Sequence, residues 1–192
     1  NYIEHEHPGM NLKIENSIII LSGAFINSKG YKMIFDNIEN FGLIHLGDEY
    51  YSDPIWYYDK AKFVIRNYIR TTQLSDNLLT IPLGYGNYYY NNEKIVEIKK
   101  FKYYWTFIGS IKNKPTREKM IEYMKKTFDY DYYVFISSND KSLSPEECVE
   151  IYKHSLFVLC PKGHYNSETF RILECLEYKC IPIIEGEKYY YQ

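Results

Sequence analysis

The residues best suited to chemistry lie in the run from Phe157 to Glu185, FVLCPKGHYNSETFRILECLEYKCIPIIE. An apolar, strand-like segment ends at Cys160, a loop follows, and Arg171 and Glu174 lie three residues apart in a helix-like segment. A helix N-terminus offers free N–H groups and the positive end of the helix dipole, which suit a diphosphate. Arg171 can donate two bonds to phosphate oxygens, and Glu174, about one turn along, can accept from ribose hydroxyls. The run predicts a nucleotide site, although an ordinary surface ion pair has the same spacing.

The strands and helices expected along the chain show where this run lies in the fold. Short apolar segments alternate with amphipathic ones, which is typical of an α/β chain with a mostly parallel sheet. We expect strands at 17–24, 41–46, 62–68, 78–83, 105–108, 132–136, 156–160 and 180–184, and helices at 30–40, 116–128, 144–153 and 167–178. The third helix has a marked start, because Ser144 and Glu147 form a capping box around Pro145. Ligands bind beyond the carboxyl ends of the strands in such sheets, and the loop after Cys160 is at such an end.

The same run resembles the exostosin-type glycosyltransferases. Those proteins carry C-P-x-G, then S-x-R-x-x-E-A-L, then G-C-I-P-V-I across a strand, a loop, a helix and a strand. The matching positions are Cys160, Pro161, Gly163, Ser167, Arg171, Glu174, Leu176, Cys180, Ile181, Pro182 and Ile184. The chain departs by one extra residue between Ser167 and Arg171, and it has Cys175 and Lys179 where the family has Ala and Gly. The resemblance implies a donor-binding set that includes Lys162, Gly163, His164, Ser167, Arg171 and Glu174.

A second patch of the resemblance is WTFIGSIKNKPTR, residues 105–117. The family begins its donor-binding domain with a strand, then F-x-G, then a loop and an Arg that opens a helix. The resemblance therefore adds Gly109, Ser110 and Arg117 to the donor-binding set. It implies that Gly109 lets the backbone approach the phosphates and that Arg117 faces the diphosphate from the other side. Without the downstream run, Gly109 reads as a plain turn glycine.

The segment HLGDEYYSD, residues 45–53, resembles an L-x-D-E run found in exostosin relatives that include the ribitol xylosyltransferases. The resemblance implies that Asp48 and Glu49 lie at the carboxyl end of a strand and face a cleft between two lobes. An inverting transferase needs a general base to deprotonate the acceptor hydroxyl, and either carboxylate is a candidate catalytic residue. The alternative is a loop-capping or salt-bridging pair. His45 is interpreted as a structural strand residue rather than as a base.

Other polar residues have weaker claims. Arg66 and Arg70 alternate with apolar residues, so they either line the cleft or belong to a solvated or structural face. His5 and His7, near the start of the chain, are interpreted as solvated rather than as metal ligands. The segment Asp129 to Asp131 formally matches a D-x-D metal motif, but we interpret it as a turn before a strand. We therefore expect neither a metal site nor an obligatory cofactor.

Composition narrows the function classes. The chain has 192 residues, 45% of them hydrophobic, and a net charge of -2, which argues against a general nucleic-acid or anionic-membrane binder. No apolar stretch approaches the roughly 20 residues of a membrane span. The 4 cysteines form no C-x-x-C pair, so we expect buried free thiols. The 23 tyrosines indicate either AT-rich coding DNA or a carbohydrate-stacking surface.

The sequence therefore predicts an α/β, GT-B-like fold with two Rossmann-like lobes, mostly parallel sheets and an incomplete first lobe. Residues 1–90 are expected to form the acceptor-side lobe, 91–102 a connector and 103–192 the donor-binding lobe. The implied reaction moves a sugar, with inversion, from a nucleotide diphosphate donor to a hydroxyl of a glycan or glycoprotein acceptor. A UDP-sugar is expected from the resemblance. The alternatives are a non-catalytic nucleotide-sugar-binding module and a Tyr-rich carbohydrate-binding interaction protein.

The two ends of the chain bear on its setting. The sequence opens on Asn1 without a recognisable signal peptide and closes on Gln192 soon after an apolar strand. This pattern is consistent with a domain excised from a longer or membrane-anchored protein. It indicates no particular compartment.

Overall fold

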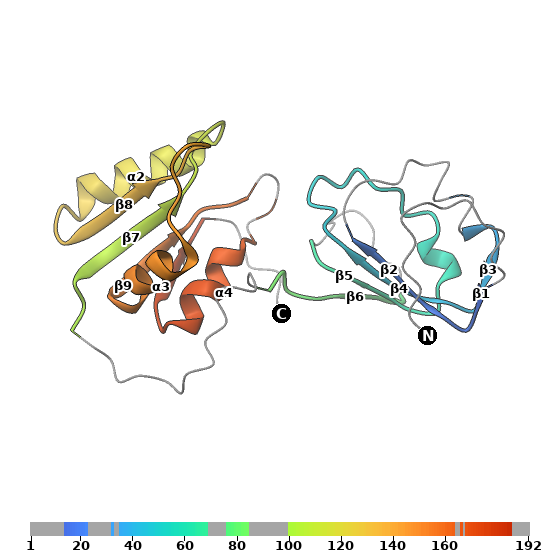
Figure 1. The fold of residues 1–192 in the computed structure, drawn as a ribbon. Helices are drawn as coiled ribbons and strands as arrows, with labels where there is room; N and C mark the ends of the chain where they lie inside the picture. The colour runs from blue at the N-terminus through green and yellow to red at the C-terminus, as the bar shows by residue number, and fades with distance from the viewer. Residues whose placement is uncertain are drawn as a thin grey trace. The chain divides into compact units, whose positions relative to one another are not determined.

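The chain forms two compact units, Asn1–Pro82 and Leu83–Gln192. A computed structural model describes residues 14–22, 32, 35–68, 76–84, 100–163, 166 and 168–185. Each unit is built around a four-stranded sheet in which every paired strand is parallel (Figure 1). The expected α/β class with two parallel-sheet lobes is confirmed. Residues 91–99 of the expected connector lie outside the described residues.

The sheet of the first unit follows chain order. Its strands are β2 (Ile18–Ser22), β4 (Gly42–Leu46), β5 (Val64–Arg66) and β6 (Leu78–Thr80), arranged β2-β4-β5-β6. A short pair, β1 (Ile14–Glu15) and β3 (Ile38–Glu39), forms a separate parallel ladder, and η1 (Tyr58–Lys60) is a single 3-10 turn. The four main strands confirm the strands expected from residue 17 to residue 83.

The core of the first unit lies on one face of this sheet. Leu43 and Val64 are neighbours in the ladder and are both fully buried. The rings of Phe35 and Tyr57 stack above them at a centroid distance of 4.1 Å. This aromatic layer holds the residues that follow β4, and these residues carry the polar cluster described below.

The helix expected at 30–40 was wrong over its last residues. Lys32 and Phe35 are helical, but the chain turns at Asp36 and residues 38–39 form β3. Ile38 reaches the core from this strand, and Asn40 takes a positive φ of 55° to lead into β4. Pairing with β1 and burial in the core outweigh a local helical period.

The second unit has three layers. Its sheet contains β7 (Tyr103–Gly109), β8 (Tyr132–Ile136), β9 (Ser155–Cys160) and β10 (Ile181–Ile184) in the order β10-β9-β7-β8. Helix α2 (Pro115–Thr127) covers one face, and α3 (Pro145–Lys153) and α4 (Phe170–Glu177) cover the other (Figure 1). Every strand and helix expected beyond residue 103 is present.

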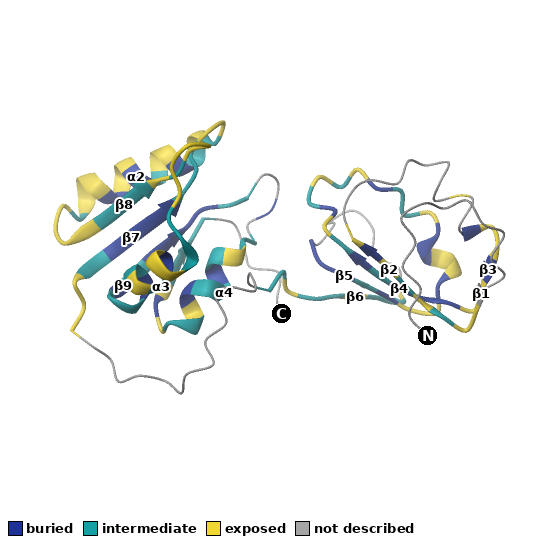
Figure 2. Ribbon diagram, in the orientation of Figure 1, coloured by how far each residue is buried: buried dark blue, intermediate teal, exposed yellow. Residues whose placement is uncertain are grey.

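Side chains alternate across this sheet, as a strand with two covered faces requires. Trp105 and Phe107 of β7 pack with the α2 residues Ile121 and Met124. Ile108 points to the other face, where it packs in one cluster with residues of α3 and α4. The middle of β7 is accordingly buried (Figure 2). The loop that follows Gly109 therefore begins at the end of a buried central strand.

Helix termini set the length of the loops. The capping box at α3 is confirmed, because the Ser144 side chain accepts from the Glu147 amide and the Glu147 carboxylate accepts from the Ser144 amide. Helix α4 begins at Phe170, three residues later than expected from Ser167, because Thr169 is still extended. The loop after β9 is therefore longer than the sequence pattern indicated.

The C-terminus of α4 forms a Schellman motif. Lys179 N–H donates to the carbonyl of Leu176 at 3.0 Å, and Cys180 N–H donates to the carbonyl of Cys175 at 2.9 Å. Lys179 has a φ of 61°, a conformation that favours glycine. The exostosin pattern has glycine at this position, so the departure places a lysine in a strained turn.

The order of the strands creates a switch point in the second unit. From β7 the chain moves through α2 to β8 on one side, and then through α3 to β9 on the other side of β7. The loops that leave β7 and β9 therefore diverge from adjacent strand ends. Such a point is where open α/β sheets bind ligands.

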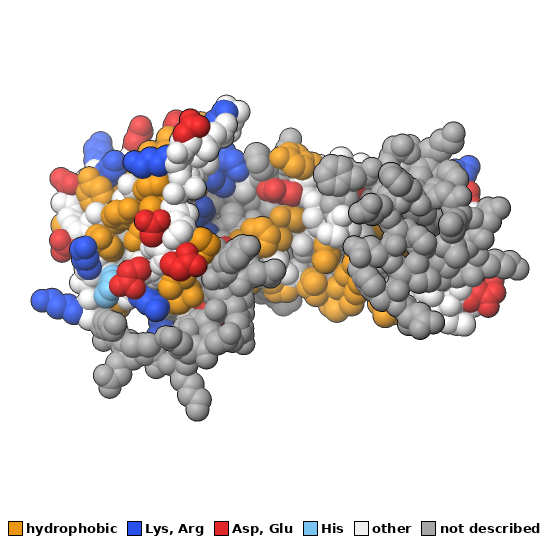
Figure 3. All heavy atoms as spheres, in the orientation of Figure 1, with side chains coloured by type: hydrophobic (Ala, Val, Ile, Leu, Met, Phe, Trp, Pro, Cys, Tyr) orange, Lys and Arg blue, Asp and Glu red, His pale blue; other side chains and the backbone are white. Residues whose placement is uncertain are grey.

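Acidic and basic side chains are interspersed on the face of the second unit seen in Figure 3. Among the described helices, none combines the length and the apolar character needed to cross a lipid bilayer.

Candidate functional site

The loops after β7 and β9 are tied together by Arg117. Its Nη1 donates to the carbonyl of Ser110 at 2.7 Å, and its Nε and Nη2 donate to the carbonyl of Lys162 at 3.3 and 3.1 Å. The side chain is buried, with 7% of the residue exposed. The guanidinium thus fixes the two strand-end loops at the switch point with respect to each other.

Arg171 lies against the end of β7. Its Nε donates to the carbonyl of Ile108 at 3.0 Å, and its guanidinium carbon lies 5.3 Å from the centroid of the Phe107 ring. Gly109 has a φ of 154°, and a Cβ atom there would lie 2.5 Å from Nη2 of Arg171. The guanidinium can lie at the strand end only because residue 109 has no side chain.

The loop after β9 is held by its own backbone contacts. The amide of Lys162 donates to Oε2 of Glu185 at 3.2 Å, and the amide of Gly163 donates to the carbonyl of Asn166 at 2.8 Å. The amide of Leu83 donates to a carboxylate oxygen of Glu168. These bonds shape a loop that leads from the sheet edge to the N-terminus of α4.

The four thiols of the second unit are buried. Cys148, Cys160, Cys175 and Cys180 are all buried and free, which confirms the expectation from the sequence. Burial raises the pKa of the Cys160 thiol far above its ordinary value, and the neighbouring Cys175 thiol adds to the effect. Burial also raises the pKa of Cys180 to about 12. Protonated, buried thiols are poor nucleophiles and poor metal ligands.

The structure brings most of the expected donor-binding residues to one edge of the sheet. Gly109, Ser110, Arg117, Lys162 and Gly163 belong to the two joined loops or contact them, and Arg171 reaches the end of β7 from α4. Glu174 lies one turn further along α4 and is half-buried. His164 and Ser167 lie outside the described residues.

Arg117 makes contacts that the sequence resemblance did not predict. The sequence resemblance placed it against the diphosphate, but its donors are directed to backbone carbonyls of Ser110 and Lys162. The reason is its position in the first turn of α2, directly beneath the two loops. It links the two loops of the candidate site.

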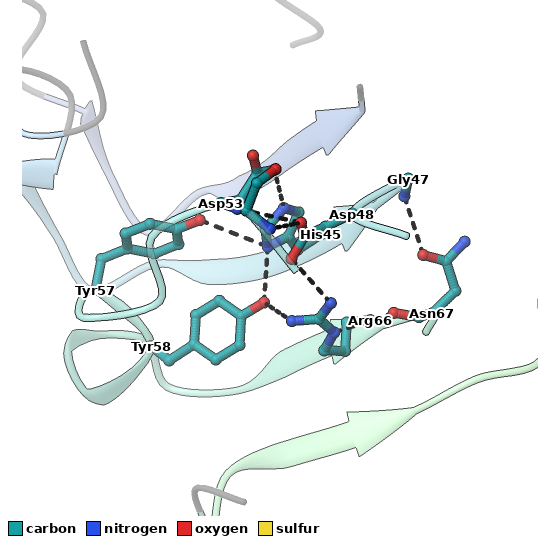
Figure 4. Close-up of polar contacts among 9 residues, drawn as sticks. His45, Gly47, Asp48, Asp53, Tyr57, Tyr58, Arg66 and Asn67 are labelled. Carbon is teal, nitrogen blue, oxygen red and sulfur yellow. Dashed lines mark hydrogen bonds and ion pairs between the residues drawn. The ribbon is translucent and has the colours of Figure 1, made fainter. Parts of the chain in front are cut away.

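A second polar cluster lies in the first unit at the carboxyl ends of β4 and β5 (Figure 4). Nε2 of His45 lies 2.9 Å from Oδ2 of Asp53, and Nδ1 of His45 lies 2.7 Å from the hydroxyl of Tyr58. Arg66 donates through Nη1 to the same Tyr58 hydroxyl at 3.0 Å. His45 and Arg66 are each 1% exposed, so the cluster is internal.

Asp48 is the anchor of the same cluster. Its Oδ1 accepts from the amides of Ser52 at 2.8 Å and Asp53 at 3.1 Å, and its Oδ2 accepts from Nη2 of Arg66 at 3.2 Å (Figure 4). It is only 2% exposed. The loop-capping and salt-bridging interpretation therefore describes Asp48, while the adjacent Glu49 is half-buried.

The hydrogen bonds around His45 match a neutral imidazole. Arg66 donates to the Tyr58 oxygen, so Tyr58 can donate its proton to Nδ1, and Nε2–H can donate to Asp53. Burial lowers the pKa of His45, while the hydrogen bond to Asp53 raises it and the charge of Arg66 lowers it, with a net downward shift. His45 is thus a structural strand residue, as the sequence indicated.

This cluster also contains the group of possible metal ligands found among the described residues. Ligand atoms of His45, Asp48 and Asp53 lie within 4.8 Å of one another. Those atoms already bind each other, Arg66 or backbone amides. The guanidinium of Arg66 supplies the positive charge that a cation would otherwise supply. The group therefore forms a closed network and not an open coordination site.

The D-x-D-like segment lies elsewhere. Asp129 and Asp131 precede β8, and Asp131 takes a positive φ of 44° in the bend. The segment is at the amino end of that strand, opposite to the carboxyl ends that carry the candidate site. The interpretation as a turn before a strand is confirmed.

Several residues of these two clusters escaped the sequence argument. Asp53 and Tyr58 were visible only as members of a Tyr-rich stretch, and Glu185 only as the residue after the last strand. Arg66 was left between a cleft-lining and a structural position, and its burial settles the structural one. Arg70 lies outside the described residues. No local spacing reveals pairings such as that of Arg66 with Asp48, 18 residues away.

Comparison with solved structures gives the fold of the chain. The chain is similar to a structure described as "Crystal Structure of alpha1,3-Fucosyltransferase", with a TM-score of 0.55 and 14% sequence identity. The match covers 93% of this chain and 58% of that one, so this chain spans little more than half the length of the matched protein. This similarity establishes the fold alone, and it agrees with the expected GT-B-like class.

Comparison of sequences gives the family. No curated protein matches the chain. A family model described as "RXYLT1 C-terminal domain" matches residues 85–190, which is more than half of the 192 residues. The matched range includes both strand-end loops and Arg171. The chain belongs to the RXYLT1 C-terminal domain family.

Proposed function

We propose that the chain is a glycosyltransferase domain that uses a nucleotide diphosphate sugar as its donor. In this proposal the unit Leu83–Gln192 binds the donor, as expected for residues 103–192, and the unit Asn1–Pro82 serves the acceptor side, as expected for residues 1–90. The donor is a UDP-sugar, and the acceptor is a hydroxyl of a glycan or glycoprotein. The reaction inverts the anomeric centre. We also propose that the chain is related to the exostosin-type glycosyltransferases.

One observation carries the proposal. Arg171 lies at the carboxyl end of β7, beside Gly109 and at the switch point between β7 and β9. A guanidinium held there by a backbone carbonyl and an aromatic ring is a fixed cation beside a strand-end loop, which suits the recognition of phosphate oxygens. Membership in the RXYLT1 C-terminal domain family and the fucosyltransferase-like fold support this assignment.

The remaining donor-binding residues act around Arg171. The amides at the N-terminus of α4, together with Gly163 and Lys162, stabilise the negative charge of the diphosphate as it leaves. Ser110 belongs to the loop after β7, and Arg117 holds that loop in place by donating to the Ser110 carbonyl. Glu174 accepts from ribose hydroxyls, and His164 and Ser167 complete the set from the loop before α4. No metal ion is required, because fixed cations and helix amides supply the positive charge.

Donor binding tests the proposal directly. Calorimetric titration of the full chain with UDP-, GDP- and CMP-sugars is expected to give binding with UDP-sugars. Arg171→Ala and Glu174→Ala should each weaken this binding about tenfold or more, since each removes a charged hydrogen bond. Lys119→Ala is the matched control, because Lys119 is an exposed cation on α2. Unchanged affinity in both site variants would remove the donor-site assignment.

A second candidate function is a nucleotide-sugar-binding module without turnover. It needs only the donor-side residues around Arg171, and these lie within residues 85–190, the range that the family model matches. The two functions differ in one measurement, the release of free nucleotide from the bound donor with and without a glycan acceptor. Acceptor-dependent release supports the transferase. Binding without release in any acceptor supports the module.

A further inference from the structure

The turn that joins α2 to β8 carries a group of side chains that the candidate donor site does not use (Figure 1). Asp129 and Asp131 are exposed, and neither carboxylate forms a hydrogen bond or an ion pair within the part of the chain that the structure describes. Tyr130 lies between them in the sequence and is 50% exposed. One turn therefore presents an exposed aromatic ring together with two unpaired carboxylates.

The backbone of this turn is held on both sides of Tyr130. The buried indole of Trp105 donates through Nε1 to the carbonyl of Phe128 at 2.9 Å. The amide of Tyr104 donates to the carbonyl of Asp131, whose positive φ of 44° bends the chain toward β8. Both donors belong to β7, the central strand of the sheet. A ligand that binds to the turn therefore meets a preformed arrangement, which lowers the entropic cost of binding.

The ring of Tyr130 leans against two other rings without being covered by them. Its centroid lies 5.0 Å from that of Tyr104 at an interplanar angle of 45°, and 6.5 Å from that of Phe128 at 78°. Partial burial against these rings raises the pKa of Tyr130 above its ordinary value of 10.0, and a hydrogen bond with the Tyr104 side chain adds to the rise. The hydroxyl is therefore protonated at neutral pH. Since neither neighbour stacks flat on Tyr130, one face of its ring can pack on a ligand.

The charges next to the turn balance each other. Lys125 and Lys126 lie in the last turn of α2 and are exposed, and Nζ of Lys125 lies 5.7 Å from the centroid of the Tyr132 ring. These two cations precede the two carboxylates by only a few residues. Such balance favours an uncharged ligand over a basic peptide or an anion. Because carboxylates only accept hydrogen bonds, that ligand must supply the donors.

We infer that Asp129, Tyr130 and Asp131 form a binding site for a neutral glycan, separate from the donor site. One sugar unit packs its apolar C–H face on the ring of Tyr130, and its hydroxyls donate to the two carboxylates. A sugar combines an apolar face with a rim of hydroxyl donors, which matches what the turn presents. The site lies at the amino end of β8, whereas the candidate donor site lies at the carboxyl ends of the strands of the same sheet. The inference therefore does not depend on the proposed transferase function.

Binding of neutral oligosaccharides to the full chain tests the inference. Saturation-transfer NMR with cellohexaose and with chitohexaose, each at up to about 10 mM, is expected to show binding of at least one of them. Tyr130→Ala should weaken that binding about tenfold or more, because it removes the ring on which the sugar packs. The double variant Asp129→Asn/Asp131→Asn should weaken it about tenfold, because neutral amides replace two charged acceptors.

Three variants serve as controls. Tyr123→Ala should change nothing, because Tyr123 is 65% exposed on α2 and has no ring neighbour among the described residues. Tyr130→Phe keeps the ring and should keep most of the affinity for the oligosaccharide. Arg171→Ala should leave that affinity unchanged. Tyr130→Ala, in turn, should leave the affinity for the UDP-sugar unchanged.

Four results would overturn the inference. The first is that neither oligosaccharide binds, and the second is that Tyr123→Ala loses as much affinity as Tyr130→Ala. The third is loss of oligosaccharide binding in Arg171→Ala, which would place the sugar at the donor site. The fourth is an oligolysine peptide that binds through Asp129 and Asp131 while the oligosaccharides do not, which would assign the turn to a basic protein segment. Failure of UDP-sugar binding would contradict the proposed function and leave the glycan site standing.

Discussion

Arg171 packs so closely on Gly109 that a Cβ atom at residue 109 would clash with its guanidinium. A Cβ atom at residue 109 would lie 2.5 Å from Nη2 of Arg171, and the backbone there has a φ of 154°. Arg171 keeps its place by donating to the carbonyl of Ile108, the residue just before the glycine. The absence of a side chain at residue 109 leaves room for a guanidinium at the end of β7.

Gly109→Ala should therefore displace Arg171 and weaken donor binding. We expect the affinity for a UDP-sugar to fall about tenfold, which corresponds to about 1.4 kcal/mol. Titration of the double variant Gly109→Ala/Arg171→Ala provides the control. If the glycine acts through the arginine, the two losses do not add. Independent, additive losses would show that Gly109 has a separate role.

Arg117 should contribute to stability more than to ligand recognition. Arg117→Met removes the donors that join the carbonyls of Ser110 and Lys162, and we expect a loss of about 3 kcal/mol in the free energy of unfolding. Lys119→Met, an exposed position on the same helix, should change that free energy by no more than about 0.5 kcal/mol. Urea titration measures both. Equal midpoints for the two variants would show that the link between the loops is dispensable.

His45 should make stability depend on pH in the mildly acidic range. Burial lowers the pKa of the folded-state imidazole below its ordinary value of 6.5, so the unfolded chain takes up the proton more readily. The stability is fully present above about pH 6.5 and is lost as the pH falls toward the folded-state pKa. Urea midpoints between about pH 7.5 and about pH 5.5 should fall in the wild type and change less in His45→Gln.

His154 offers the matched control for this measurement. Its side chain is 28% exposed and pairs with Glu150 on the surface of α3. His154→Gln should leave the slope of the midpoint with pH as in the wild type. A slope that vanishes in His154→Gln but persists in His45→Gln would assign the effect to the surface pair.

The backbone at Lys179 takes a left-handed conformation that is strained for lysine and would be relaxed for glycine. Its φ is 61° within the Schellman motif that ends α4, and a non-glycine residue pays about 1 kcal/mol there. Lys179→Gly should raise the free energy of unfolding by about that amount. Glu177→Gly, at the last residue of α4, should instead lower it, by no more than about 1 kcal/mol. A destabilising Lys179→Gly would contradict the strain argument.

Local patterns were enough to predict most of the elements. The four main strands of the first unit and all seven elements of the second unit from β7 to β10 follow from apolar runs, amphipathic periods and one capping box. These signals are carried by neighbouring residues, so they survive without knowledge of the fold. They failed at residues 37–40, where Ile38 is drawn into a strand by a partner 24 residues earlier in the chain, Ile14.

The candidate donor site could be predicted in part. Arg171 and Glu174 share a helix, and Gly109 ends a strand, so their types and spacing were visible in the sequence. The position of β9 beside β7 was not visible, because strand order depends on how helices pack on both faces of the sheet. That order alone makes the loops after residues 109 and 160 neighbours. It also lets Arg117 bond to both of these loops.

The sequence by itself therefore determined the α/β alternation, the two parallel-sheet units and the residues with phosphate-binding chemistry near residue 171. Only the tertiary structure decided how deeply each of these side chains is buried and which distant residues it contacts. Asp48 and Glu49 are adjacent carboxylates that the sequence pattern does not distinguish. In the structure Asp48 is buried against Arg66, whereas Glu49 is half-buried. The reason is physical. Burial and ion pairing are set by residues that are distant in the chain, and no local pattern records them.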